Sequence, residues 1–301
     1  MNETQFNMQA EYKPLSEQNL SDDFLFDVVT VDLETCKDII EIALNKKIKE
    51  IRWKEGQKTI RNLPGKRGIR MDFYVEDMEG NIFDVEMQKR NEGNIPKRTR
   101  FYQGLIDAPL LKSGERGFDK LNPSYIIVIC CFDLFKKGLY KYTFENICLE
   151  QKDLSLGDGV TKIFLNTRGK NDAEVPKVLV DFLHYVEKSR ADMLDENSDE
   201  RLKRLHKKIN HIKNDEQMEV SYMKMEERDR IIRESGEKFG QYTMIFRFLL
   251  NRGKTNVEEI SKIFGEDRER IETMEELIRN YPAESAENLA YLLMQSININ
   301  E

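Results

Sequence analysis

Residues 68–89 constrain the fold of this chain more than any other stretch, because they have the pattern of a β-hairpin. Residues 68–77 and 81–89 both alternate between apolar and polar side chains, and this period of two is typical of half-buried strands. Gly80 ends the three residues between them. Three-residue loops with glycine in the left-handed position commonly connect hairpin strands. The sequence therefore predicts an antiparallel pair of strands.

The register of this hairpin follows if Asp77 pairs with Asn81. Asp72 then lies directly opposite Glu86. The same register predicts two further opposed pairs, Arg70 with Gln88 and Tyr74 with Asp84. The other face is apolar and consists of Met71, Phe73, Val75, Phe83, Val85 and Met87.

The predicted Asp72–Glu86 pair is unusual. Directly opposed residues have Cβ atoms about 4.5–5.5 Å apart, and like charges placed so are destabilising. A divalent cation removes this penalty, because Mg²⁺ binds oxygen ligands. The alternative is a solvated strand face on which both acids point into water.

The surrounding motifs favour the metal. Asp72, Glu86 and Gln88 have the spacing of the PD-(D/E)xK nuclease signature, with glutamine in place of the usual lysine. The supporting motifs are Ser21 to Phe26, Arg70 to Val75, Asp84 to Gln88, and Lys97 to Gln103. In this order they resemble the recombination-promoting nuclease and transposase family of the PD-(D/E)xK superfamily, in which glutamine is usual at the third position.

This resemblance implies an Mg²⁺ or Mn²⁺ cofactor held by Asp72, Glu86 and the backbone carbonyl of Met87. Gln88 lies on the same strand face as Glu86 and would position the attacking water, since an amide carries no charge. Asp23 corresponds to an acid of the family, and the resemblance implies that it either supports the metal ligands or binds a second metal ion. A helix N-cap formed by Ser21, Asp22 or Asp23 is the alternative reading.

DNA is the partner that the charge pattern favours. The chain has a net charge of −7, yet Lys46 to Arg70 contains ten basic and two acidic residues. Such local basic stripes suit a phosphate backbone. Arg98 and Tyr102 are four residues apart and share a helix face. Arg98 could pair with phosphate while Tyr102 supports the site, and a packed aromatic beside a surface arginine is the alternative. The candidate nucleic-acid-binding residues are Lys66, Arg67, Arg70, Lys89, Arg98 and Tyr102.

Composition indicates an intracellular protein. The four cysteines lack metal-site spacing and are typical of reduced thiols. The polar start of the chain has no signal-peptide core, and no apolar run reaches the roughly 20 residues that span a bilayer. We therefore expect a cytoplasmic location without a membrane partner.

The expected fold class is α/β, with the αβββαβ core of restriction-endonuclease-like proteins and a mostly helical C-terminal extension. The predicted core elements are a helix from Ser21 to Leu44, an edge strand near Ile51, the hairpin, a helix over 96–112 and a buried strand over 123–132. Two further strands, over 139–149 and 160–165, and a helix over 175–189 complete the domain.

Four regions follow from these elements. Residues 1–20 form a flexible N-terminus, 21–190 the nuclease-like domain, 191–238 a charged amphipathic helix, and 239–301 a small helical region. The amphipathic helix has a thin apolar stripe at Leu202, Leu205, Ile209 and Ile212. This stripe fits either packing on the chain's own domain or a homodimer contact, and four residues do not decide between them.

The sequence thus predicts a metal-dependent DNA endonuclease that promotes recombination or DNA mobility. The alternative is a non-catalytic nuclease-like scaffold that binds DNA or protein. A third reading is a helical interaction protein with an incidental hairpin, which binds no metal.

Overall fold

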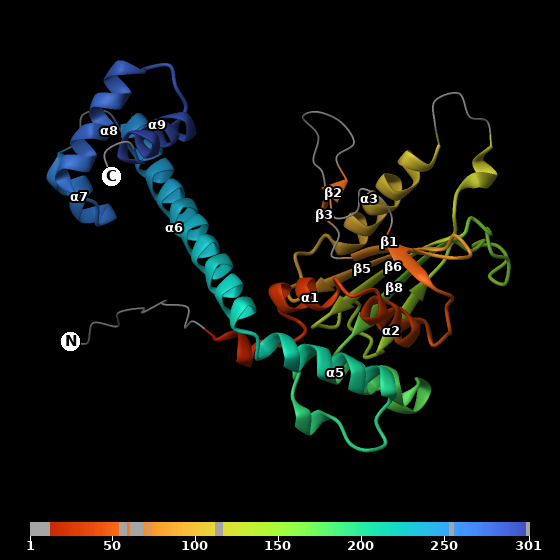
Figure 1. Ribbon diagram of the computed structural model, residues 1–301. Helices are drawn as coiled ribbons and strands as arrows, with labels where there is room; N and C mark the ends of the chain where they lie inside the picture. Colours follow the sequence, from red (N-terminus) through yellow and green to blue (C-terminus); the bar gives the residue numbers. More distant parts are fainter. Residues whose placement is uncertain are drawn as a thin grey trace. The chain divides into compact units, whose positions relative to one another are not determined.

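The computed structural model describes residues 13–53, 59–60, 69–70, 73–111, 117–252 and 256–298. The chain divides into two compact units, Met1–Glu219 and Val220–Glu301. The first unit is built around a mixed sheet with the strand order β1-β4-β5-β6-β8-β7 (Figure 1). β5, β6 and β8 are parallel, whereas β1, β4 and β7 run antiparallel to their neighbours. The element order α2, β1, β4, β5, α3, β6 confirms the predicted α/β core.

The strands of the large sheet are β1 (Ile51–Trp53), β4 (Phe73–Asp77), β5 (Ile82–Gln88), β6 (Ser124–Cys130), β7 (Lys141–Phe144) and β8 (Val160–Asn166). A separate two-stranded sheet pairs β2 (Thr59–Ile60) with β3 (Ile69–Arg70). The helices of the first unit are α1 (Asp23–Val29), α2 (Leu33–Leu44), α3 (Ile95–Asp107), α4 (Lys177–Glu187) and α5 (Glu200–Lys213). The remaining helices are α6 (Glu216–Arg252), α7 (Val257–Phe264), α8 (Arg268–Asn280) and α9 (Ala286–Asn298).

The β4–β5 hairpin has the predicted register. The described ladder pairs Phe73 with Val85, Tyr74 with Asp84, and Val75 with Phe83. The Asp77 amide donates to the Asn81 carbonyl at 3.0 Å, and Gly80 has a φ of +86°. Both Asp77 carboxylate oxygens accept hydrogen bonds from Asn81, which fixes the turn.

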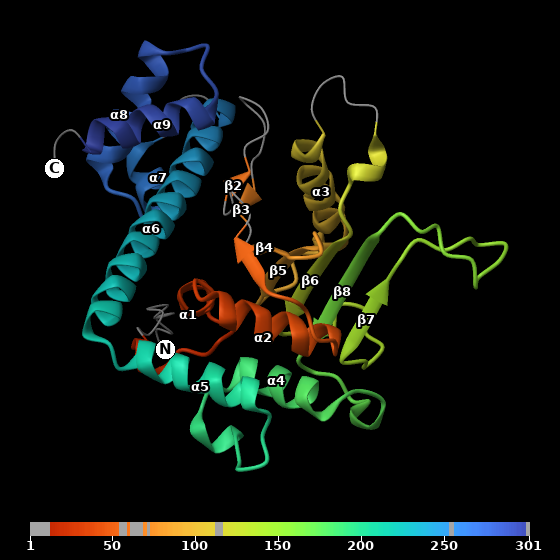
Figure 2. The ribbon, with the colours of Figure 1, turned by 45° about the vertical axis from the view of Figure 1, so that its right-hand side comes forward.

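Strand β5 is buried on both faces, although its alternating sequence predicted a half-buried strand. On one side of the sheet lie α1, α2 and α4 (Figure 2). There the ring of Phe26 in α1 lies 6.0 Å from the ring of Phe73 in the neighbouring strand β4. α3 covers the other face and places Ile95, Leu105 and Ile106 in one core cluster with β-strand residues. The two helical layers lie on opposite sides of the sheet (Figure 2).

Two helices predicted as continuous are each divided in two. The first ends at Val29 and restarts at Leu33, because the Asp32 side chain accepts hydrogen bonds from the Thr35 amide and hydroxyl. The second break separates α5 from α6 at residues 214–215, where the Asp215 carboxylate accepts from the Gln217 amide. Both breaks follow from aspartates that satisfy the exposed amides of a helix start.

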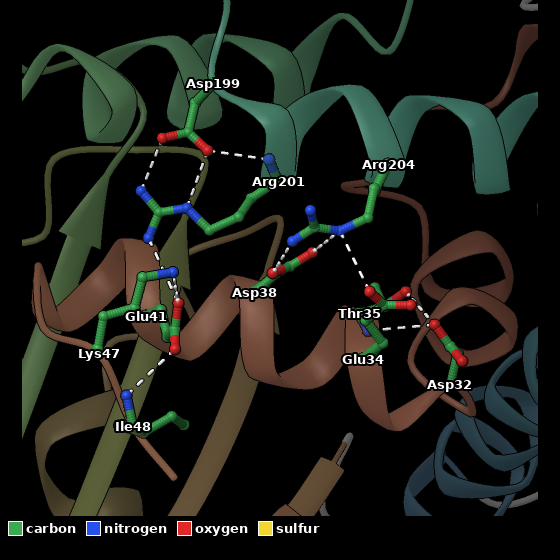
Figure 3. Close-up of polar contacts among 10 residues, drawn as sticks. All are labelled: Asp32, Glu34, Thr35, Asp38, Glu41, Lys47, Ile48, Asp199, Arg201 and Arg204. Carbon is green, nitrogen blue, oxygen red and sulfur yellow. Dashed lines mark hydrogen bonds and ion pairs between the residues drawn. The ribbon is translucent and has the colours of Figure 1, made fainter. Parts of the chain in front are cut away.

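Helix α5 packs on its own unit. Its predicted stripe of Leu202, Leu205, Ile209 and Ile212 is fully buried, and the helix contacts α1 and α2. Arg204 donates to both carboxylate oxygens of Asp38 at 2.6 and 3.0 Å. Arg201 binds Asp199 and lies 3.7 Å from Glu41, which also pairs with Lys47 (Figure 3). The apolar stripe of α5 therefore packs on the chain's own domain, which was one of its two predicted roles.

The second unit has its own core, formed by the end of α6 with α7, α8 and α9. Fully buried residues from each helix meet there, among them Phe246, Ile260, Ile271 and Leu289. α7 and α8 join through Gly265 in the left-handed conformation, and the Ser261 hydroxyl donates to the Glu266 carbonyl at 2.6 Å. In the described part of the chain, no helix is both long enough and apolar enough to cross a membrane.

Candidate active site

Strand β5 places Glu86 and Gln88 on the face that α3 covers. In the parallel ladder, Glu86 pairs with Val128 and Gln88 with Cys130. Val128 and Cys130 belong to the core cluster beneath α3, and neighbouring residues in one row of a sheet point to the same face. Glu86 is only 4% exposed, so the alternative of a solvated face does not hold for this residue. Met87 alternates to the opposite face and is also buried.

Asp84 is an acid of this face to which the sequence reasoning gave no role. It lies two residues before Glu86, opposite Tyr74, and its exposed fraction is 0%. Burial raises the pKa of the Tyr74 phenol, and the negative charge of Asp84 raises it further. Strand parity alone places Asp84, Glu86 and Gln88 in line, with successive side chains roughly 7 Å apart. The alternation of side chains along the strand was thus the sequence signal that could have identified Asp84 as a residue of this face.

Asp72, the predicted partner of Glu86, lies outside the described residues, as do Lys66 and Arg67. The described ladder starts one residue later, at the Phe73–Val85 pair. The Asp72–Glu86 pair therefore stays a prediction. Arg70 is described only as backbone, which pairs with Thr59 in the separate two-stranded sheet. The predicted pairing of Arg70 with Gln88 was therefore wrong, because the β3 backbone pairs with β2 instead of continuing the hairpin.

Helix α3 brings Arg98 and Tyr102 over the same face of the sheet. Tyr102 is buried in the core cluster with Val128 and Cys130, and the Arg98 guanidinium carbon lies 5.8 Å from its ring centroid. A weak ion pair of 3.6 Å joins Arg98 to Glu92. The positive charge of Arg98 also acts on Cys130, whose pKa burial raises to about 12. Arg98 thus lies close to the row that contains Gln88 and Cys130.

Lys89 points away from this face, and its ammonium binds the Asp22 carboxylate. Asp22 occupies the N-cap position of α1, but its other carboxylate oxygen accepts from the Asn19 amide rather than from the helix. The contact brings the first turn of α1 to the end of β5. Asp23, the candidate second ligand, is an exposed residue of that first turn.

The described cysteines, together with His184 and His206, are buried or hydrogen-bonded to neighbouring side chains and are not grouped around a common point. None of the four cysteines forms a disulfide within the described residues, and Cys36, Cys130 and Cys131 are buried. Burial also raises the pKa of Cys131, to about 11. His206 hydrogen-bonds the Tyr185 hydroxyl at 2.8 Å, and His184 the Tyr140 hydroxyl at 3.1 Å. Within the described ranges, no three His, Cys, Asp or Glu side chains are grouped as metal ligands.

A mixed sheet with an acid and a glutamine on a central strand, under a helix that presents arginine and tyrosine, defines a nuclease-like α/β domain. Comparison with protein-family models agrees with this class. Residues 36–239 match the model of the PD-(D/E)XK nuclease family transposases. The chain belongs to that family. Comparisons with curated proteins and with solved structures gave no match.

Proposed function

We propose that this chain is a divalent-metal-dependent DNA endonuclease that hydrolyses phosphodiester bonds and promotes recombination or DNA mobility. The observation that carries the proposal is the buried Glu86 on the central strand, followed by Gln88 on the same face. A family whose members are nucleases and transposases supports it.

The donor chemistry of the site fits a hard divalent cation. Burying a carboxylate costs free energy unless the charge is compensated, and Glu86 lies on a face that already contains the buried Asp84. Oxygen donors are the ligands of Mg²⁺ and Mn²⁺. Glu86, Asp72 and the Met87 carbonyl would hold the metal, with Asp23 as a further ligand. When bound, such a metal lowers the pKa of water and neutralises charge on the phosphate.

The remaining residues orient the substrate. The Gln88 amide is neutral at every pH, so it donates or accepts hydrogen bonds and takes no proton. Its task is to align the attacking water or a phosphate oxygen. Arg98 has a guanidinium that matches phosphate oxygens, and the ring of Tyr102 holds it over the site. Glu92 is the exchangeable partner of Arg98, because their ion pair is long and Glu92 is exposed.

The test is cleavage of supercoiled plasmid DNA by the purified protein with Mg²⁺ or Mn²⁺, against a Glu86→Gln variant. We expect nicked or linear product only from the unmodified chain. Equal results for both proteins contradict the proposal. DNA binding without cleavage, together with no metal binding by calorimetry, supports the non-catalytic scaffold instead. Matched DNA and RNA oligonucleotides identify the preferred substrate.

A further inference from the structure

The carboxyl ends of the parallel strands carry basic residues from several parts of the chain. The ladder continues one residue past the strands, because the Cys131 amide donates to the Gln88 carbonyl and the Thr167 amide to the Cys130 carbonyl, both at 3.0 Å. Lys89 directly follows β5, and Arg168 is the second residue after β8, at this edge. Their charges, with those of Asp22 and Glu187, all act on the buried Cys131 thiol. These charged groups therefore surround one point of the edge.

The ends of α4 and α5 reach the same place. The Ser21 amide donates to the Val186 carbonyl at 3.0 Å, and the Leu20 amide to the Ser189 hydroxyl at 2.7 Å. Lys213, the last residue of α5, donates its ammonium to the Ser189 carbonyl at 3.1 Å. Asp22, which binds Lys89, follows directly in the same segment. The ends of β5, α4 and α5 are thus tied together.

Two cations at this junction differ from Lys89 and Arg168, because they have no ion-pair partner among the described side chains. Lys89 pairs with Asp22, and Arg168 lies 3.6 Å from Glu187. Arg190 and Lys213 make no ion pair with any residue for which the structure describes a side chain. Burial lowers the pKa of the Lys213 ammonium; the charge of Asp22 opposes this effect and that of Arg190 adds to it. Two like charges, one partly buried, cost free energy that an external anion would offset.

We propose that Arg190 and Lys213, with Lys89 and Arg168 beside them, form a rim that binds the phosphates of a DNA strand crossing the carboxyl edge of the sheet. The rim begins at Lys89, the residue after Gln88, so a DNA strand bound there would pass the end of β5, the strand that carries Glu86 and Gln88. The inference rests on the proposed function, because it assigns a path to the DNA that the site would cleave.

The test measures binding of a fluorescently labelled DNA duplex by anisotropy, over a series of KCl concentrations. All proteins carry Glu86→Gln, so that cleavage does not interfere. Each phosphate contact contributes about 0.9 to the slope of log affinity against log salt. The double variant Arg190→Gln/Lys213→Gln should therefore flatten the slope by about two units, and Arg190→Gln alone by about one.

The matched control is Lys120→Gln/Lys152→Gln, which removes the same charge. Lys120 precedes the amino end of β6, and Lys152 lies between β7 and β8, before the amino end of β8. Both are exposed and belong to the opposite edge of the parallel strands. An unchanged slope in the rim variants, or an equal change in the control, overturns the proposal. If Lys213→Gln lowers the melting temperature, the exposed Arg190 decides the question by itself.

Failure of the rim and failure of the proposed function give different results. If the protein with intact rim binds no DNA and the unmodified chain cleaves none, the proposed function is wrong. If binding is strong and salt-dependent but indifferent to Arg190 and Lys213, the endonuclease proposal stands and only the rim is wrong.

Discussion

The two faces of strand β5 are buried to the same degree and differ in chemistry. Phe83, Val85 and Met87 point to the α1–α2–α4 side, and each is at most 5% exposed. Asp84 and Glu86 point to the α3 side and are equally hidden. Burial stabilises the apolar set at roughly 1.5–3 kcal/mol for each large side chain. Burial of carboxyl groups has the opposite sign, so these acids serve something other than stability.

Substitution of the acids tests the difference between the two faces of β5 most directly. Asp72→Ala and Glu86→Ala should each abolish cleavage and leave the fold intact. Glu86→Ala removes a buried acid, and Asp72→Ala removes the like charge that the predicted register places opposite it. The melting temperature without metal should therefore stay the same or rise. Plasmid cleavage and thermal unfolding of the same preparations test this. A large fall in melting temperature would show that these acids are structural.

On the apolar side the opposite result is expected. Phe73→Ala removes a ring that packs on Phe26, and truncation of a buried phenylalanine costs about 3–5 kcal/mol. Urea unfolding measures the loss. Phe118→Ala is the control, since that ring is 73% exposed and should change the free energy of unfolding by less than about 0.5 kcal/mol. Equal effects of the two changes contradict the assignment of faces.

Substitution of Gln88 should have an intermediate effect on the cleavage rate, and it tests whether this residue belongs to the site on the acidic face. Gln88→Ala removes one preorganised hydrogen-bond donor and should lower the cleavage rate about 10²–10³-fold. Gln88→Lys restores a donor and adds positive charge near the phosphate, so activity should survive or increase. Rates and melting temperatures of both variants are needed. A fully active Gln88→Ala protein excludes Gln88 from the site.

The smallest expected effect is on the pH dependence of stability, and it arises from an acid that is paired with an arginine. Arg201 holds the pKa of Asp199 at about 2, below the ordinary value of 3.8. The depressed pKa means that Asp199 stabilises the fold above pH 4 and that this contribution is lost as the pH falls toward 2. In Arg201→Gln, the free energy of unfolding should depend less steeply on pH in this window. Lys177→Gln, which breaks the exposed pair with Asp181, is expected to keep the original slope.

Local patterns predicted the hairpin well, because its register depends on Gly80, Asn81 and strict alternation. The four described pairs of the β4–β5 ladder agree with it. The burial of Asp84 and Glu86 was not predictable in this way. Period-two alternation tells which side chains share a face, but whether α3 covers that face depends on contacts distant in sequence.

The helix breaks and the basic rim show the same limit. Asp32 had the sequence position of an N-cap, three residues before Thr35, yet the apolar periodicity on either side suggested one helix. Arg190 and Lys213 are separated by more than twenty residues and meet only because Lys213 binds the Ser189 carbonyl. The candidate site residues on β5 and α3 could be named from motifs. Asp72, the predicted ligand opposite Glu86, lies outside the described residues, so this pair stays a prediction.

The buried thiols beside the site determine how the protein can be chemically labelled. Thiolates, not thiols, react with alkylating reagents. With pKa values of about 12 and 11, Cys130 and Cys131 stay protonated at neutral pH, and Cys36 is fully buried. Cys148 is partly accessible and lies in the segment between β7 and β8 (Figure 2). A maleimide dye should therefore attach at Cys148, at the opposite end of the parallel strands from Gln88, and would report on the proposed DNA binding without occupying the candidate active site.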